Sequence, residues 1–392
     1  MTFSATKVTL LIATLTLLAQ SVAAASKTEL NEVNAFLSSA EQQLREVAIE
    51  ASRGSWVAAN FITEDTQYLK AKNIARRTLL RSQLAQQAAQ FDASTLPTPL
   101  RRKLHLLKQT IVLPAPADKA LVDELATIAS GLKAQYGTGK YCPQADQCMD
   151  LVAMNKRMTN SRDPAELLDI WQGWRKIAPA MKAPYQRQVE IANAGARELG
   201  FEDLGNMWRS GYDMHADAFS ADVDRQWQRV KPLYQALHCH VRAKLSENYG
   251  SEHVAPDGMI PAHLLGNMWA QNWVNIYDLV APEQGQAALD LDAIIDQRGL
   301  SEIDMVKNAE QFFISLGMAP LPNTFWQRSL FTKPRDRKVQ CHASAWNLDY
   351  QDDLRIKMCI QRTGEHFSTI HHELGHNYYQ RAYNQQDLLY QR

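Results

Sequence analysis

The sequence lacks a net charge, and it also lacks internal repeats and low-complexity tails. Its 42 lysine and arginine residues equal its 42 aspartate and glutamate residues. A chain with this balance offers no electrostatic basis for binding nucleic acid. No clear linker marks a domain boundary, so we expect residues 25–392 to belong to one large helical body.

Long hydrophobic runs are missing except at the N-terminus. There Lys7 precedes the apolar run from Val8 to Leu18, which is too short to cross a bilayer. Small residues at 22–25 then offer a cleavage site, so we expect residues 1–24 to be a secretory signal peptide. The alternative is an N-terminal anchor helix. With a signal peptide, the mature chain would be secreted or periplasmic and would have no transmembrane segment.

Cysteine is scarce, and the five residues of this type do not settle their own pairing. Cys142 and Cys148 flank a short polar stretch, while Cys341 and Cys359 form another candidate pair. Export would permit disulfides, but four cysteines allow three connectivities. Cys239 is left over within a helical pattern, and we interpret it as an inert core residue.

Extended segments are also few, because most of the chain shows the apolar periodicity of helices. Asp163, Pro164 and Glu166 form a strong helix start, with an N-cap, a proline at the first position and a glutamate at the third. Only residues 338–346 and 353–360 are typical of a β-hairpin. We therefore expect a mainly α fold with one small hairpin. The other expected helices cover residues 27–91, 117–135, 183–214, 219–248, 262–278 and 301–316.

What the sequence does contain is a metal-binding motif close to its last residue. His372, Glu373 and His376 form an H-E-x-x-H pattern, which on a helix places both imidazoles on one face. The apolar residues Ile370 and Leu374 lie on roughly the opposite side, together with Phe367 and Tyr378. A helix buried on that side would present both histidines towards a cavity. Glu373 could then take a proton from a water bound to the metal.

The motif leaves the third ligand open, because a catalytic zinc usually takes three protein ligands. After His376 the sequence has no further histidine or glutamate, only Asp387. One hypothesis is therefore an H-E-x-x-H hydrolase that uses Asp387 as its third ligand.

The predicted hairpin leads directly into the motif helix, which suggests a mechanical use for it. The edge of a strand can pair with the backbone of an extended peptide. Small residues at 343–345 would let a substrate approach, and His342 could donate a hydrogen bond to a carbonyl. The alternative is a covered strand whose histidine is simply hydrogen-bonded.

Six segments carry a recognisable pattern: residues 142–148, 208–212, 260–271, 312–317, 341–346 and 371–376. Taken together and in this order, they resemble the angiotensin-converting enzyme family of zinc peptidyl-dipeptidases. These enzymes remove dipeptides from the C-termini of peptides. The six segments run nearly the length of the mature chain, which makes the resemblance specific. It implies an almost entirely helical fold with two lobes around a deep groove, Zn²⁺ and chloride as ligands, and a peptide as substrate.

The resemblance also implies roles for individual residues. His372 and His376 would be zinc ligands, and Glu373 would be the general base. The remaining roles are substrate contacts for His342, Ala343, Ala345 and Gln271, chloride sites for Arg175 and Tyr212, and the disulfides Cys142–Cys148 and Cys341–Cys359. Gln271 would hold the C-terminal carboxylate of the substrate.

One departure from the family pattern affects the expected activity. In this family a glutamate roughly two dozen residues beyond the second histidine completes the three-ligand zinc site. The sequence ends before that point, so we expect residues 25–392 to be the N-terminal two-thirds of a single metallopeptidase domain. We also expect weak zinc binding and little activity. The alternative hypothesis is an inactive peptide-binding relic.

Overall fold

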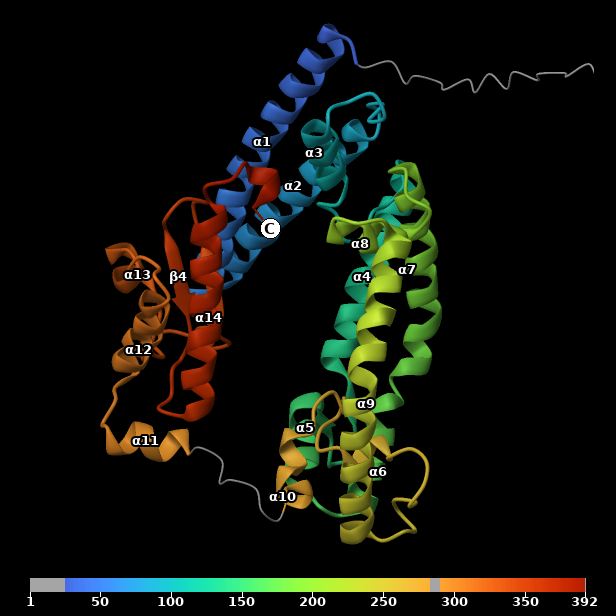
Figure 1. The fold of residues 1–392 in the computed structure, drawn as a ribbon, viewed down its shortest axis with the longest axis vertical. Helices are drawn as coiled ribbons and strands as arrows, with labels where there is room; N and C mark the ends of the chain where they lie inside the picture. Colours follow the sequence, from blue (N-terminus) through green and yellow to red (C-terminus); the bar gives the residue numbers. More distant parts are fainter. Residues whose placement is uncertain (1–24, 283–289, 392) are drawn as a thin grey trace, which may run out of the picture.

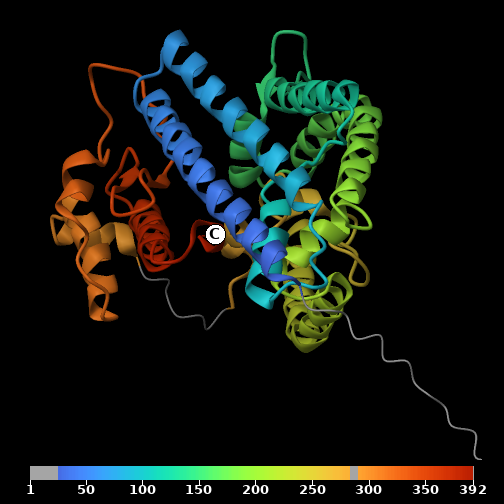
Figure 2. The same cartoon turned by 90° about the horizontal axis from the view of Figure 1, so that it is seen from above.

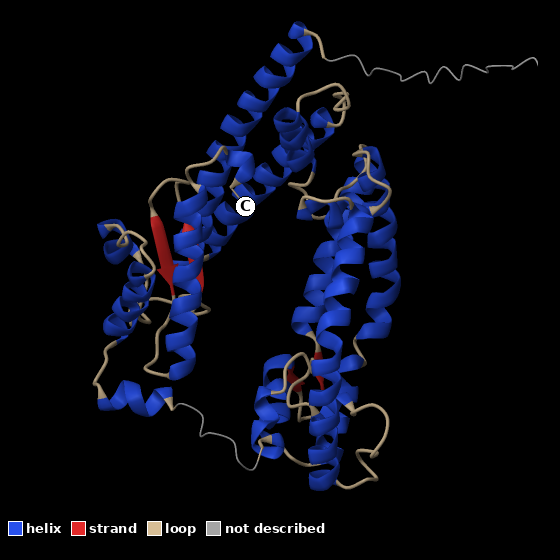
Figure 3. Ribbon diagram, viewed as in Figure 1, coloured by secondary structure: helices blue, strands red, loops and turns tan. Residues whose placement is uncertain are grey.

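A computed structural model describes residues 25–282 and 290–391, and within them helices dominate. The expected signal peptide, residues 1–24, lies outside the described residues. Figure 3 shows the helical character, with only two small antiparallel sheets in the described part of the chain. The prediction of a mainly α fold is confirmed.

The described elements have the following bounds. The helices are α1 (Lys27–Asn60), α2 (Glu64–Ala88), α3 (Thr98–Lys108), α4 (Lys119–Thr138), α5 (Leu151–Asn160), α6 (Pro164–Arg175), α7 (Ala178–Glu198), α8 (Leu204–Arg209), α9 (Ala216–Tyr249), α10 (Tyr277–Val280), α11 (Leu291–Gln297), α12 (Glu302–Ser315), α13 (Asn323–Arg328) and α14 (Gly364–Tyr383). The 3-10 turns are η1 (Ser210–Tyr212), η2 (Ala262–Leu264), η3 (Val274–Ile276) and η4 (Leu388–Tyr390). The strands are β1 (Lys140–Tyr141), β2 (Met149–Asp150), β3 (Ser344–Asn347) and β4 (Leu354–Lys357).

Side-chain caps explain where several helices begin. The Asp163 carboxylate accepts a hydrogen bond from the backbone of Ala165, and Pro164 occupies the first helical position of α6, as predicted. Ser301 caps α12 in a reciprocal capping box with Asp304. These caps satisfy backbone N–H groups that would otherwise lack acceptors in the first turn.

The helices form two groups that α1, α2 and α3 connect (Figure 1). One group contains α4 to α10, and its core includes Met154, Ile170 and Leu245. The other contains α11 to α14 with β3 and β4. Seen from above, the long helices α1 and α2 lie side by side across the molecule (Figure 2). None of the described helices is long and apolar enough to span a membrane.

The helix expected at residues 262–278 is absent. The segment forms η2, irregular backbone, η3 and the short α10 instead. Gly266 and Ala270 adopt positive φ angles of 85° and 53°, which no α-helix accommodates. The Asn267 side chain also accepts hydrogen bonds from the backbone of Trp269 and Ala270, so it competes with helical hydrogen bonding.

Cys239 is a second correction to the sequence analysis. It lies on α9 as expected, but its side chain is exposed and not part of the core. A helical pattern places a residue on a helix, whereas the neighbouring elements decide which face is covered.

Asp353 ties the hairpin to the surrounding helices. Its carboxylate is only 4% exposed and accepts two hydrogen bonds from Arg355 of β4, each 2.8 Å long. Arg328 of α13 donates to it at 2.9 Å, and Arg53 of α1 lies 3.9 Å away. Burial raises the pKa of Asp353, but the hydrogen bonds and positive charges of Arg355 and Arg328 outweigh burial and lower it overall.

Replacing Asp353 with asparagine is therefore expected to destabilise the fold by about 3 kcal/mol, because it leaves the guanidinium of Arg355, whose side chain is only 11% exposed, without its carboxylate partner. The pKa of Asp353 is lower in the folded state than in the unfolded state. The stabilisation from its ionised carboxylate is therefore fully present at pH values above the unfolded-state pKa. It is lost as the pH falls through the folded value. Urea unfolding at pH 7 and at pH 3 should show a smaller difference between variant and wild type at pH 3. Asp352→Asn is the matched control, because its carboxylate is exposed and its loss should change stability little.

Candidate metal centre

Helix α14 carries the H-E-x-x-H motif and begins where the sequence predicts a helix. Thr363 caps it by accepting a hydrogen bond from the backbone of His366. The predicted apolar stripe is buried: Ile370, Leu374 and Tyr378 pack into the core formed with α12 and β4. Full burial of one aliphatic side chain of this size stabilises a fold by about 1.5–3 kcal/mol. The stripe therefore determines which face of α14 points inwards.

His372 and His376 lie on the exposed side of α14 and converge. Their Nε2 atoms are 3.0 Å apart. Two imidazole nitrogens at about 2.0–2.1 Å from one tetrahedral zinc would be about 3.3 Å apart. The observed spacing therefore fits a shared metal ion. Glu373, which follows His372 on the helix, is buried, with 8% of its surface exposed.

Neither His371 nor Asp387 joins the histidine pair. The His371 Nδ1 atom lies 2.8 Å from the carbonyl oxygen of Phe367, and its ring packs near Phe312 of α12. The Asp387 carboxylate forms an ion pair with Lys103 of α3, with 2.7 Å between Oδ2 and Nζ. Residues 25–282 and 290–391 contain no group of three histidine, cysteine or acidic side chains that could hold a metal. The hypothesis of Asp387 as third ligand therefore finds no support in the geometry.

Replacing Asp387 with alanine is expected to leave the zinc affinity unchanged. Its carboxylate is committed to Lys103, and its side chain is 62% exposed, so the stability loss should stay below about 1 kcal/mol. Titration of the apoprotein with Zn²⁺ against a competing chelator measures the affinity. A tenfold or greater loss of affinity in this variant would restore Asp387 as a ligand.

The hairpin lies directly against α14. Its strands β3 and β4 pair in antiparallel register, with Ala345 opposite Ile356. The buried Asn377 side chain of α14 donates to the carbonyls of Trp346 in β3 and Arg355 in β4, each at 3.4 Å. Hydrogen bonds from this side chain to the strand backbone thus help to hold β3 and β4 in place against α14.

The strands are shorter than predicted, and this changes the position of two candidate residues. Ala345 lies in β3, but His342 and Ala343 precede it. The cause is the Cys341–Cys359 disulfide together with Lys357, which hold residues 340–342 to β4 without ladder hydrogen bonds. In the described part of the chain, β3 has β4 as its single strand partner, so its other edge has no strand beside it.

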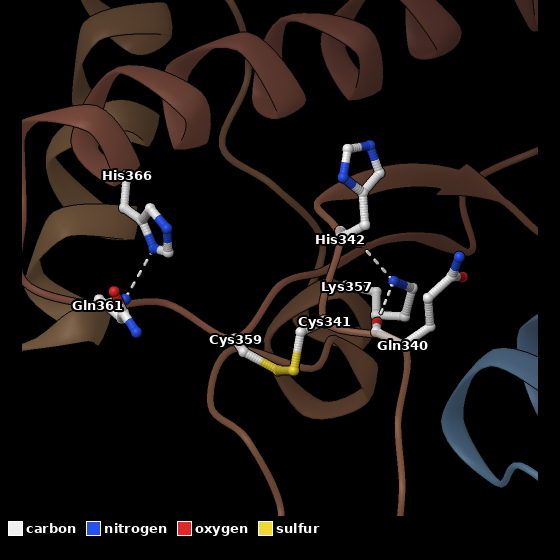
Figure 4. The surroundings of a disulfide bond; sticks show 7 residues. All are labelled: Gln340, Cys341, His342, Lys357, Cys359, Gln361 and His366. Carbon is white, nitrogen blue, oxygen red and sulfur yellow. Dashed lines mark hydrogen bonds between the residues drawn. A yellow bond between two sulfur atoms is a disulfide. The ribbon is translucent and has the colours of Figure 1, made fainter. Parts of the chain in front are cut away.

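Lys357 is a site residue that the sequence analysis missed. Its side chain is 1% exposed, and its ammonium donates to the carbonyl oxygens of Gln340 at 2.5 Å and His342 at 2.6 Å. Figure 4 shows this arrangement beside the disulfide, with the His342 ring pointing away from it. Burial lowers the pKa of Lys357, whereas the nearby charge of Glu373 raises it. Strand alternation places Lys357 on the face opposite Ile356, so the sequence pattern could not reveal that residues 340–342 cover it.

The remaining predicted site residues lie away from α14, in the other group of helices. Gln271 is exposed and lines a cavity of about 750 Å³ together with Tyr234 and Trp273. Figure 1 shows the nearby α9 and α10 well separated from α14. In the described part of the chain, α14 therefore contacts the hairpin through Asn377, whereas Gln271 belongs to the other group of helices.

The two candidate chloride residues occupy separate surroundings. The Arg175 guanidinium lies 3.5 Å from the ring centre of Trp171 and donates to the carbonyl of Met268 at 3.1 Å. Burial lowers its pKa. Tyr212 stacks on Phe219 with ring centres 4.1 Å apart and lines a different cavity, of about 710 Å³.

Both proposed disulfides are present. Cys142 pairs with Cys148, closing the loop between β1 and β2, and Cys341 pairs with Cys359. Closing the longer loop is expected to stabilise the hairpin by about 2–4 kcal/mol, which helps to hold the strand beside α14.

Comparison with known proteins gives one consistent result. Residues 27–392 match the family model described as angiotensin-converting enzyme, peptidase M2. Angiotensin-converting enzyme from Bos taurus is 36% identical over 369 residues, which is 91% of this chain and 27% of the bovine protein. The proteins of the same name from Rattus norvegicus and Oryctolagus cuniculus are 33% identical over 89% of the chain and 39% identical over 71%. The chain matches about a quarter of the length of these relatives.

Proposed function

The chain belongs to the angiotensin-converting enzyme family of metallopeptidases, and we propose that it acts in zinc-dependent removal of C-terminal dipeptides from peptides. The observation that carries this proposal is the convergence of His372 and His376 on α14, the helix that packs against β3. Among the described residues, the other edge of β3 has no strand partner, and such an edge can pair with an extended peptide.

His372 and His376 would hold the zinc ion through their Nε2 atoms. When bound, zinc polarises a carbonyl and makes a water acidic enough to attack it near neutral pH. Glu373 would act as the general base, because it follows His372 directly on α14 and a carboxylate there could accept a proton from the attacking water. Burial of Ile370 and Leu374 holds all three side chains on one rigid helix.

The substrate backbone would pair with the outer edge of β3, at Ala345, and with the preceding Ala343. Small side chains permit that approach. His342 is exposed, while its carbonyl is engaged by Lys357, so its ring would be free to donate to a substrate carbonyl. Gln271 would hold the terminal carboxylate if peptide binding brought the two groups of helices together.

Chloride would bind at Arg175 and at Tyr212. Support for the first position is the guanidinium of Arg175, which has two carbonyl acceptors and no carboxylate partner in the described part of the chain. We also propose secretion or a periplasmic location, because the two disulfides require an oxidising compartment and residues 1–24 have the pattern of a signal peptide.

The test combines zinc titration with mass spectrometry of products from an N-terminally blocked peptide of about six residues. We expect stoichiometric but weak zinc binding, and slow release of C-terminal dipeptides that stops when a chelator is added. Release of single C-terminal residues, or cleavage that persists in the chelator, would contradict the proposal. Zinc-independent peptide binding without cleavage would instead favour a peptide-binding protein.

A further inference from the structure

A small cavity lies where α1, α2, α3 and η4 meet the turn between β3 and β4. Its volume is about 200 Å³. Segments far apart in the sequence line it, because the 3-10 turn η4 near the C-terminus packs against α1 and α3 (Figure 1). The lining used below consists of Arg81 of α2, Thr110, Tyr350, Leu44, Leu106 and Leu389.

Arg81 is the charged group of this cavity. In the part of the chain that the structure describes, its partly buried guanidinium makes no hydrogen bond or ion pair, and its Nε atom is fully buried without an acceptor. Burial lowers the pKa of Arg81, and the positive charge of Arg77 one turn earlier lowers it further. An arginine stays charged in a protein, so this site carries uncompensated positive charge.

Two acidic side chains at the neighbouring turn η4 are already paired. Glu41 and Asp387 both pair with Lys103, at 3.0 and 2.7 Å. A desolvated cation without a counter-ion is costly, and buried charges are normally paired. Within the described residues, the charge of Arg81 therefore favours an anion in the cavity.

The other walls indicate the shape of that anion. Tyr350 lies at the tip of the β3–β4 hairpin with a left-handed φ of 58°, held by a 2.9 Å hydrogen bond from its backbone N–H to Asn347. Tyr350 and Thr110 line the cavity, and the Thr110 hydroxyl donates to the carbonyl oxygen of Leu107 at 2.8 Å. Leu44, Leu106 and Leu389 contribute apolar side chains. The lining thus combines one cationic group with hydroxyl and aliphatic groups.

We propose that this cavity is a binding site for a short aliphatic carboxylate, with the carboxylate on Arg81 and the tail against the three leucines. Guanidinium and carboxylate match in geometry as well as in charge. At about 30 Å³ per water, the cavity volume corresponds to about seven waters. A two- to four-carbon acid fits this space together with a water for Gln391, whose Oε1 atom has no partner.

The test is thermal unfolding of the full chain while sodium chloride is replaced by sodium butyrate at constant ionic strength. Binding to the folded state alone should raise the melting temperature by about 2 °C when butyrate reaches ten times its dissociation constant. Acetate should bind about fourfold more weakly for each methylene that it lacks, because it leaves part of the apolar wall in contact with water. Equilibrium dialysis with labelled butyrate should show one saturable site per chain.

Arg81→Met is the diagnostic variant and Arg76→Met its matched control. Arg76 lies on the same helix but pairs with Glu50 on the surface. Arg81→Met should abolish the butyrate shift and should melt no lower than wild type in chloride, because it removes an unpaired charge. Arg76→Met should keep the butyrate shift. The proposal fails if butyrate and chloride give the same melting temperature, if dialysis finds no saturable site, or if Arg81→Met responds like wild type. These measurements do not depend on zinc or on peptide hydrolysis.

Discussion

Replacing His372 or His376 with alanine is expected to remove most of the zinc affinity of the chain. Their Nε2 atoms meet at 3.0 Å, and the described residues offer no third histidine, cysteine or acidic side chain nearby to compensate. Loss of a partner that only orients a metal ligand already lowers affinity by about 10- to 100-fold. Loss of a direct ligand should therefore lower it by about 100-fold or more. Titration with Co²⁺ or Zn²⁺ against a chelator of known affinity measures this change without requiring enzyme activity.

His371 provides the control for this experiment. It is adjacent in sequence and on the same helix, but its ring contacts the Phe367 carbonyl and Phe312. His371→Ala should keep the metal affinity of the wild type. An equal loss in all three variants would mean that α14 itself unfolds, which circular dichroism would reveal. Unchanged affinity in His372→Ala and His376→Ala would refute the metal centre.

Replacing Glu373 with glutamine is expected to reduce peptide hydrolysis by about 10²- to 10⁴-fold, the usual contribution of a positioned general base. Glutamine has nearly the same shape as glutamate but cannot accept the proton. Zinc affinity should change little, because the two histidines remain in place. The measurement is the initial rate of dipeptide release at saturating zinc, normalised to the wild-type chain.

Glu365 is the matched glutamate on the same helix. It lies in the first turn of α14, where its carboxylate is exposed. Glu365→Gln should retain the wild-type rate and metal affinity. If Glu373→Gln hydrolyses peptide as fast as wild type, Glu373 is not the base, even if zinc still binds. Equal losses in both variants would point to a general effect of charge on the helix.

The local features of the fold were predictable because they depend on neighbouring residues. The α6 start at Asp163 and Pro164 follows from cap chemistry, and the buried side of α14 follows from a helical repeat of apolar residues. The hairpin was also predicted, although its strands are shorter than expected. In contrast, the helix expected at residues 262–278 failed, because the Asn267 side chain and the positive φ angles of Gly266 and Ala270 interrupt it.

The approach of the two motif histidines was predictable for the same local reason. Residues four apart on a helix share a face, so His372 and His376 were certain to approach each other once α14 formed. Gln271, Arg175 and Tyr212 were suggested by family resemblance alone. No spacing rule relates them to α14, and the structure places them in the other group of helices.

By itself, the sequence determined the helical class, the hairpin next to the motif helix and the pair of histidines, because caps and periodicity act within a few residues. Only the tertiary structure decided which polar groups became buried or unpaired. Lys357 donates hydrogen bonds to the backbone at residues 340–342, and Asp353 lies close to three arginines from separate elements. Arg81 lines a cavity and, among the described residues, its Nε atom has no acceptor. The cost of burying a charge depends on what the rest of the chain brings to it, and that is a property of packing between distant segments.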